Sequence, residues 1–207
     1  MPRKKLKRIN AARELVNVIE SEKVQDLLSG QQVVVEVGCG DGLFAIEYAR
    51  RNPDLLVLGL DVKLDRLFKA GTKALELGIK NCIFSRMRAE DLSQFIPELS
   101  LSQIWLTFSD PHPKKGNAKK RLTHARFLKV YNQLLGLQGK VCFKSDSDLL
   151  YNFTLEQLSE LNIEPTLNVV DTHLELDSSS PYLIETVFEK KFREQGISIK
   201  ALEWVKL

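Results

Sequence analysis

VVVEVGCGDG, residues 33–42, is the stretch that decides the fold. Valines surround Glu36, and glycines follow at Gly38, Gly40 and Gly42. This pattern is typical of a buried parallel strand that ends in a tight turn and leads directly into a helix. Glycines let the backbone bend sharply there and let a ligand approach it closely. We therefore expect a ligand at the end of this strand, with the Glu36 carboxylate facing it.

A second apolar run, LLVLGLD at residues 55–61, ends in Asp61. A carboxylate at this distance from a glycine turn accepts hydrogen bonds from both hydroxyl groups of a ribose. The turn and Asp61 together predict a cofactor that contains adenosine, bound on a Rossmann-like half-sheet.

Acidic residues at the turn bear on which adenosine cofactor binds. A dinucleotide places its pyrophosphate at the start of the helix, where the carboxylates of Glu36 and Asp41 would repel it. S-adenosylmethionine carries a sulfonium and an ammonium group, which these acids attract. The sequence therefore favours a methyltransferase over an NAD-dependent oxidoreductase, and a strand, turn and helix without any ligand is the remaining alternative.

The composition limits the class of protein. A chain of 207 residues with 43% apolar residues fits one globular domain with a full core. No apolar run approaches the roughly 20 residues that span a bilayer, so we expect no membrane partner. The basic start leads into no apolar signal core and the three cysteines are widely spaced, which predicts a cytoplasmic protein with reduced thiols. We expect a basic flexible arm over residues 1–10 and a single domain over residues 11–207.

Basic residues are clustered, although the net charge is only +3. One cluster lies within residues 3–8 and the other within residues 114–126. Two clusters on a nearly neutral background are typical of phosphate binding. A solvated surface is the alternative, and we favour that alternative for the first cluster taken alone.

Strands and helices alternate along the chain with short connections. The expected strands cover residues 33–37, 55–60, 81–87, 103–108, 140–144, 166–171 and 182–190. The expected helices cover residues 11–29, 41–51, 63–77, 91–96, 122–136 and 147–161, and residues 109–120 and 172–181 are expected to be loops. This order predicts an α/β fold with a mostly parallel twisted sheet and helices on both faces. The last two strands have no helix between them, which predicts an antiparallel strand at one edge.

Polar residues follow five of these strands. Ligands of such sheets lie beyond the carboxyl ends of the strands, which meet at one edge. The residues at or near those ends are Glu36, Asp61, Arg88, Asp110 and Asp146. We expect their side chains to line one rim of the sheet, because packing alone does not explain such a convergence.

TFSDPHPKKGNAKKRL, residues 107–122, is the more specific signal. Asp110 ends a strand, and Pro111 and Pro113 stiffen the turn that follows. Such a turn would hold one carboxylate at the reactive end of the cofactor, beside a loop rich in lysine. An acid for the chemistry next to cations for phosphates suits the modification of a nucleotide within a polymer.

The combination of VEVGCGDG, GLD, FSDPHPKK…KKRL and FKSD resembles the bacterial tRNA (guanine-N7)-methyltransferase family, from about residue 30 onward. A T-x-x-E at residues 186–189 belongs to the same likeness. The resemblance implies a Rossmann-like class I methyltransferase fold, S-adenosylmethionine as cofactor and tRNA as partner. It implies RNA binding and tRNA modification, in which guanine 46 of the variable loop becomes 7-methylguanosine.

Together with the glycine turn, the resemblance implies a set of site residues. The cofactor site would be lined by Glu36, Gly38, Gly40, Asp61, Arg88, Glu90 and Asp110, with Asp110 as the catalytic residue. The substrate would contact Lys114, Asp146, Thr186 and Glu189. The RNA-contact loop would comprise Gly116, Asn117, Ala118, Lys119, Lys120 and Arg121.

The chain departs from the family pattern at four positions. His112 stands where the family has the tryptophan of D-P-W-P, although an imidazole also stacks on a base. Arg88 stands where an acid is common, and because arginine accepts no hydrogen bond, adenine contacts would fall to Glu90 or to the backbone. Cys39 replaces the serine of G-S-G, and Phe188 replaces the tyrosine of T-x-Y-E.

The chemistry of guanine N7 suits a site of this kind. N7 has a free lone pair, so the enzyme needs no base and has mainly to align N7 with the methyl group and the sulfur. Positive charge then moves onto the guanine ring, where a carboxylate stabilises it. Asp110 and Asp146 are both candidates, and one of them could instead read the guanine N1–H and amine. The sequence does not divide these roles.

Several alternatives stay open. A class I methyltransferase acting on another RNA, a small molecule or a protein needs the same cofactor site, and a non-catalytic RNA-binding protein would keep the fold. Asp146 could serve only as a helix cap. His112, His124 and His173 lack metal-ligand spacing, so we expect no metal. The sequence leaves the oligomeric state undetermined.

Overall fold

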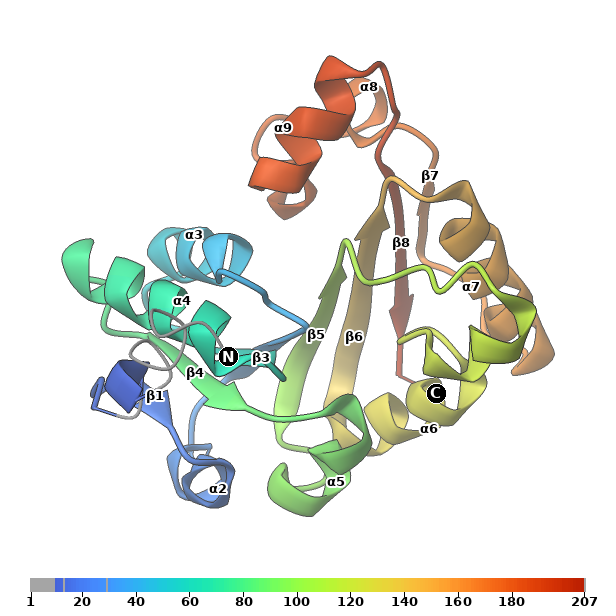
Figure 1. Cartoon of the computed structure of the whole chain (residues 1–207). Helices are drawn as coiled ribbons and strands as arrows, with labels where there is room; N and C mark the ends of the chain where they lie inside the picture. Colours follow the sequence, from blue (N-terminus) through green and yellow to red (C-terminus); the bar gives the residue numbers. More distant parts are fainter. Residues whose placement is uncertain (1–9, 13, 29, 207) are drawn as a thin grey trace.

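The computed structural model describes residues 10–12, 14–28 and 30–206. Most of the expected basic arm lies outside these residues, and the division into an arm and one domain stays a prediction. Figure 1 shows a central sheet with helices on both sides. No helix in the described part of the chain combines the length and the apolar character that crossing a membrane requires.

The sheet has eight strands in the order β1-β4-β3-β2-β5-β6-β8-β7 among the residues described. Neighbours from β1 to β6 run parallel, whereas β8 runs antiparallel to both β6 and β7. The prediction of a mostly parallel α/β sheet with an antiparallel strand at one edge is confirmed. The strands are β1 Val18–Ile19, β2 Val33–Val37, β3 Leu56–Asp61, β4 Cys82–Arg86, β5 Leu101–Thr107, β6 Leu135–Ser145, β7 Leu167–Val169 and β8 Lys200–Val205.

Helices cover both faces because the strands are apolar on both faces. In β2, Val33 and Val35 pack into one cluster with α6 and α7, while Val34 packs into the other with α3 and α4. Glu36 follows Val34 by two residues and so lies on the α3 face. The α-helices are α2 Val24–Leu27, α3 Leu43–Arg51, α4 Leu64–Glu76, α5 Leu92–Phe95, α6 Ala125–Leu134, α7 Asp148–Glu160, α8 Thr172–Glu175 and α9 Val187–Glu194. The 3-10 helices are η1 Ser21–Lys23, η2 Ala89–Asp91, η3 Lys115–Lys120 and η4 Pro181–Leu183.

The turn between β2 and α3 depends on its glycines. Gly38, Gly40 and Gly42 have φ of 82°, 58° and 73°, in the left-handed region that other residues avoid. A Cβ on Gly42 would lie 2.6 Å from that of Ala70 and 2.8 Å from the ring of Phe84. Gly42 therefore lets the start of α3 pack closely against α4 and β4, in addition to forming the turn.

The prediction of one helix over residues 11–29 holds, among the described residues, only at residues 11–12 and in α2, Val24–Leu27, and is wrong at β1. Val18–Ile19 forms β1, and its neighbour Asn17 accepts a hydrogen bond from the N–H of Phe84 at 2.8 Å. The apolar spacing of this segment suits a helix, but the free edge of β4 offers backbone partners that the segment cannot supply itself. Pairing with the sheet overrides the local preference.

The predicted strand over residues 182–190 is also wrong. Residues from Val187 form α9, because the Thr186 hydroxyl caps the helix by accepting the N–H of Glu189 at 3.1 Å. The last strand is β8, in which Trp204 is only 3% exposed. The strands β7 and β8 are thus joined through α8, η4 and α9, and two segments expected as loops carry η3, α8 and η4.

Candidate active site

A pocket of about 780 Å³ opens where β2, β3 and β5 end. Its size suits a nucleoside cofactor. Of the predicted site residues, it is lined by Glu36, Gly38, Gly40, Asp61, Glu90, Asp110, Lys120 and Thr186. The pocket lining does not include Arg88, Lys114, Asp146, Glu189, Gly116, Asn117, Ala118, Lys119 or Arg121. Apart from the glycines, five residues were predicted to bind the cofactor: Glu36, Asp61, Arg88, Glu90 and Asp110. All of them except Arg88 line this pocket, and the Arg88 side chain is 69% exposed.

Glu36 is held in one orientation at the base of the pocket. Its carboxylate accepts the backbone N–H of Ala45 at 3.1 Å and the hydroxyl of Thr107 at 2.5 Å, and the residue is 1% exposed. Burial raises the pKa of Glu36 to about 7, although both hydrogen bonds and the charge of Lys144 act to lower it. A cation in the pocket would therefore interact with a carboxylate that is poorly solvated because it is buried.

Asp61 joins two strands at the rim. Its Oδ2 accepts the N–H of Gly40 at 3.0 Å and its Oδ1 accepts the N–H of Lys63 at 2.8 Å. Arg66 approaches the same carboxylate, with Nη1 3.5 Å from Oδ2. A carboxylate has about four acceptor sites, so Asp61 keeps capacity for further donors.

Asp110 stands at the mouth of the pocket, with 68% of its side chain exposed. Its Oδ1 accepts the backbone N–H of His112 at 2.9 Å, and His112 has a φ of 41°. Arg121 braces this turn from behind, since it donates to the carbonyls of Pro111 at 2.9 Å and of His112 at 3.2 Å. The turn is therefore held by hydrogen bonds in addition to its prolines.

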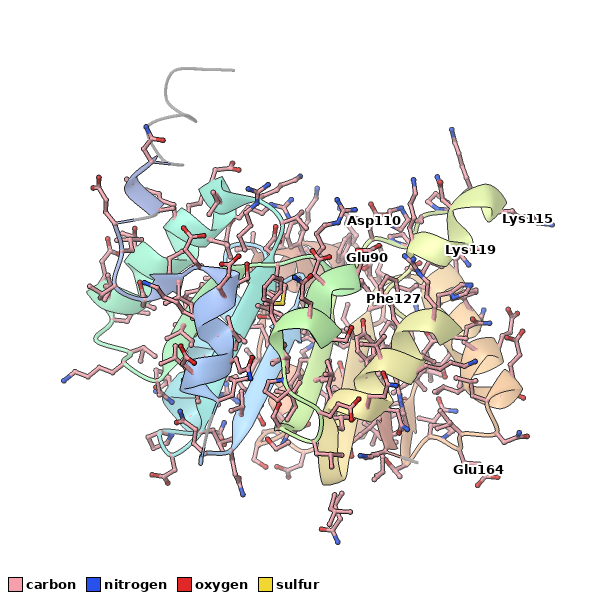
Figure 2. All side chains as sticks on the ribbon, turned by 90° about the horizontal axis from the view of Figure 1, so that it is seen from below. Glu90, Asp110, Lys115, Lys119, Phe127 and Glu164 are labelled. Carbon is pink, nitrogen blue, oxygen red and sulfur yellow. The ribbon has the colours of Figure 1, made fainter. Side chains whose placement is uncertain are left out.

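Arg121 differs from the other residues of the predicted RNA-contact loop. It is 7% exposed, and its guanidinium lies 4.3 Å from the centre of the Phe153 ring. The structure thus gives Arg121 a bracing role and does not place it on the surface. The two lysines of the loop, Lys119 and Lys120, are exposed, as are Lys114 and Lys115 just before it. Figure 2 shows Lys115 and Lys119 toward the same edge of the molecule as Asp110 and Glu90, with Glu164 toward the opposite edge.

Glu90 pairs with a residue that the sequence analysis did not connect to it. Its Oε1 lies 2.9 Å from Nη2 of Arg126, and its Oε2 lies 3.7 Å from Nε of Arg88. The Arg126 guanidinium also stacks 4.1 Å from the centre of the Phe127 ring. Two arginines therefore orient this carboxylate at the rim of the pocket.

Asp146 follows β6 directly, at the same edge of the sheet. The helix that follows is capped by Ser147, whose hydroxyl accepts the N–H of Leu150 at 3.2 Å. The Asp146 carboxyl is therefore not the cap of α7. Burial raises its pKa above the ordinary value.

Two buried residues near the pocket were not recognised from the sequence. In the sequence, Thr107 and Lys144 are seen only as parts of expected strands. Lys144 is 0% exposed in the structure and pairs with the equally buried Glu189. The position of Lys144 two residues before Asp146 was the available signal, but only α9 crossing the end of β6 reveals its partner.

No group of three or more histidine, cysteine or acidic side chains that could hold a metal occurs in the described part of the chain. The absence of a metal stays a prediction. Cys39, Cys82 and Cys142 are free and buried, as expected for core thiols.

Comparisons with known proteins identify the family. A family model described as "Putative methyltransferase" matches residues 30–202. The tRNA (guanine-N(7)-)-methyltransferase of Cytophaga hutchinsonii is 32% identical over 216 residues, which cover 99% of this chain and 98% of that protein. The protein of the same name from Mycoplasma pneumoniae is 33% identical over 182 residues, covering 87% of each chain.

A solved structure supports the fold independently. The 16S rRNA methyltransferase KamB superposes with a TM-score of 0.66 at 16% identity, covering 87% of this chain and 91% of that one. At this identity the likeness shows the methyltransferase fold and does not extend to the substrate. By the family model and by relatives that align over nearly its full length, this chain belongs to the tRNA (guanine-N7)-methyltransferase family.

Proposed function

We propose that this chain transfers the methyl group of S-adenosylmethionine to N7 of guanine 46 in the variable loop of tRNA. The observation that carries the proposal is the pocket itself. It combines the buried acids Glu36 and Asp61 with Asp110 at its mouth, and exposed lysines of η3 stand beside that mouth. Acids inside suit a cationic methyl donor, and cations outside suit the phosphates of RNA.

Two features of the pocket suit S-adenosylmethionine. A Cβ built on Gly40 meets no atom within 4 Å, so the backbone of the turn is open to close approach. Asp61, one residue beyond the end of the neighbouring apolar run, has acceptor capacity for the ribose hydroxyls. When bound, S-adenosylmethionine supplies an electrophilic methyl group on its sulfonium.

The residues of the chain then contribute alignment and electrostatics. Glu36 presents negative charge to the cationic part of the cofactor, and the bonds from Ala45 and Thr107 prevent it from turning away. Asp110 faces the mouth, where the target base enters, and its carboxylate stabilises positive charge on the guanine ring. Asp146 lies at the same edge and is the candidate for reading the guanine N1–H and amine.

Residues 116–120 of the predicted RNA-contact loop, with Lys114 and Lys115 before them, are the proposed RNA contact, and Arg121 is left out because it is buried. The lysines can bind phosphates. Gly116, Asn117 and Ala118 have small side chains, so they leave the lysines of η3 accessible to RNA. A base within folded RNA has to leave its stack before N7 reaches the cofactor, and phosphate contacts hold the opened loop. A cytoplasmic location, where tRNA is modified and processed, is part of the same proposal.

Methylation of unmodified tRNA in vitro tests the proposal. The protein is incubated with S-adenosylmethionine labelled on the methyl group and with a tRNA transcript, and the labelled nucleoside is then mapped. We expect label in 7-methylguanosine at position 46 and none in a transcript that carries adenine there. Label on another base, or on a small molecule or another RNA in place of tRNA, would contradict the proposal.

A further inference from the structure

A buried ion pair connects β6 to α9. Lys144, the penultimate residue of β6, and Glu189, in the first turn of α9, are both 0% exposed, and Nζ of Lys144 lies 2.5 Å from Oε2 of Glu189. Such a pair is costly to desolvate and is retained only where its geometry is good. Its location next to the pocket raises the question of what it holds.

The Lys144 ammonium makes three contacts with one segment. Besides Glu189, it donates to the carbonyls of Tyr182 at 3.0 Å and of Ile184 at 2.7 Å. These contacts use all three N–H donors of the ammonium. Residues 182–189 are therefore tied to the end of β6 at three points.

Glu189 and its neighbours complete the attachment. The second carboxylate oxygen, Oε1, lies 3.0 Å from Nε2 of His173, so both oxygens are engaged within the protein. The Phe192 ring of α9 stacks on Phe108, with ring centres 6.2 Å apart. Figure 1 shows α9 beyond the carboxyl ends of β5 and β6, as these contacts require.

The residues that this attachment carries face the pocket. Thr186, Val187 and Phe188 line it, and the apolar side chains of Val187 and Phe188 are 68% and 61% exposed. Their position follows from the attachment of Glu189, the next residue, to Lys144.

We propose that Lys144 and Glu189 are positioning residues, which hold the first turn of α9 so that Thr186, Val187 and Phe188 form the wall against which the target base aligns. The proposal rests on the proposed function, because it names what keeps that wall in place during methyl transfer. It gives Glu189 a role through Lys144, in place of direct contact with the substrate. The charge of Lys144 also acts to lower the pKa of Glu36 at the base of the same pocket.

A double-mutant cycle on methyl transfer tests the proposal. The variants are Lys144→Met, Glu189→Gln and the two combined, each first compared with the wild type by circular dichroism and thermal unfolding. We expect kcat to fall roughly a hundredfold in each single variant, because misplaced groups cost about that much, and to fall no further in the combined variant. The dissociation constant for tRNA should change less than threefold.

A direct contact between Glu189 and the substrate predicts a different result. In that case either the two single losses would multiply in the combined variant, or Lys144→Met alone would leave kcat close to the wild-type value. Either outcome overturns the proposal. The matched control is Glu185→Gln, which alters an exposed glutamate of the same segment that pairs with Arg193 at 3.4 Å, and it should leave kcat unchanged.

Hydrogen exchange gives a readout that does not depend on the substrate. Amides of residues 182–194 should exchange at least tenfold faster in Lys144→Met and in Glu189→Gln than in the wild type or Glu185→Gln. Unchanged exchange in both would refute the positioning role. A wild-type protein that leaves tRNA unmethylated would instead refute the proposed function, while the exchange result would still decide whether the pair holds α9.

Discussion

The backbone N–H of Gly40 donates a hydrogen bond of 3.0 Å to Oδ2 of Asp61. This bond connects the glycine turn after β2 to the acid that ends β3, and the two strands are neighbours in the sheet. The turn and the acid are thus one unit, in which a change on one side moves the other. Both residues belong to the proposed cofactor site.

Asp61→Asn should weaken the binding of S-adenosylmethionine by roughly 10- to 100-fold, the value of one or two hydrogen bonds to a charged group. An amide has a single oxygen, so it cannot keep the bonds from Gly40 and Lys63 and also accept from the ribose. Isothermal titration calorimetry measures the dissociation constant. Asp54→Asn, at an exposed position, is the control and should bind normally, and equal affinity in both variants would exclude this role for Asp61.

The stability of the protein should fall as the pH rises from 4.5 to about 7 because of Glu36. Below pH 4.5 its carboxyl is protonated in the folded and the unfolded state alike. Between the two values only the unfolded state loses the proton, so the free energy of unfolding decreases, by about 3 kcal/mol for this shift of pKa. Urea unfolding at several pH values measures the effect, and Glu36→Gln should remove it.

The affinity for S-adenosylmethionine should rise as the pH passes through 7, since the ionised form of Glu36 attracts the cationic cofactor. We expect roughly tenfold tighter binding at pH 8 than at pH 6, which corresponds to the ionisation of one group. Titration calorimetry in buffers of different ionisation enthalpy also counts the protons released. Affinity that rises equally in Glu36→Gln would assign the effect to another group.

Gly42→Ala should destabilise the protein by about 2–5 kcal/mol, because it combines backbone strain with overpacking. The residue has a φ of 73°, and the added Cβ would meet Ala70 and the Phe84 ring at 2.6 and 2.8 Å. Gly78→Ala is the matched control, with a φ of 68° and no atom within 4 Å, so it should cost about 1 kcal/mol. Thermal and urea unfolding measure both, and equal losses would mean that the close packing of α3 is unimportant.

Replacing Lys119 and Lys120 by alanine should weaken tRNA binding and make it less dependent on salt. Each lost phosphate contact should lower the slope of log affinity against log salt by about 0.7–0.9. Arg121 is kept in this variant because it braces the Asp110 turn, so its loss would confuse the result. Lys80→Ala, an exposed lysine just before β4, is the control, and an unchanged slope in the double variant would exclude η3 as the RNA contact.

Much of the sheet and of the pocket at its edge could be predicted from the sequence, because those signals are local. Glu36, the glycine turn and Asp61 lie within short segments whose spacing dictates a strand, a turn and a helix, and parallel pairing then places the strand ends at one edge. The same reasoning placed Asp110 at this edge of the sheet, where it lines the pocket. For β1 and α9 the local pattern misled, since the free edge of β4 and the Thr186 cap outweighed it.

The amino-acid sequence by itself determined the parallel α/β sheet and the acidic edge that it carries, because neighbouring residues encode those features. Only the tertiary structure decided that Lys144 meets Glu189, 45 positions away, and that Arg121 turns inward under the loop it was expected to join. The physical reason is burial. A charged side chain in a sequence looks solvated until the fold brings a partner to it, and that partner comes from an element whose position depends on the packing of the whole chain.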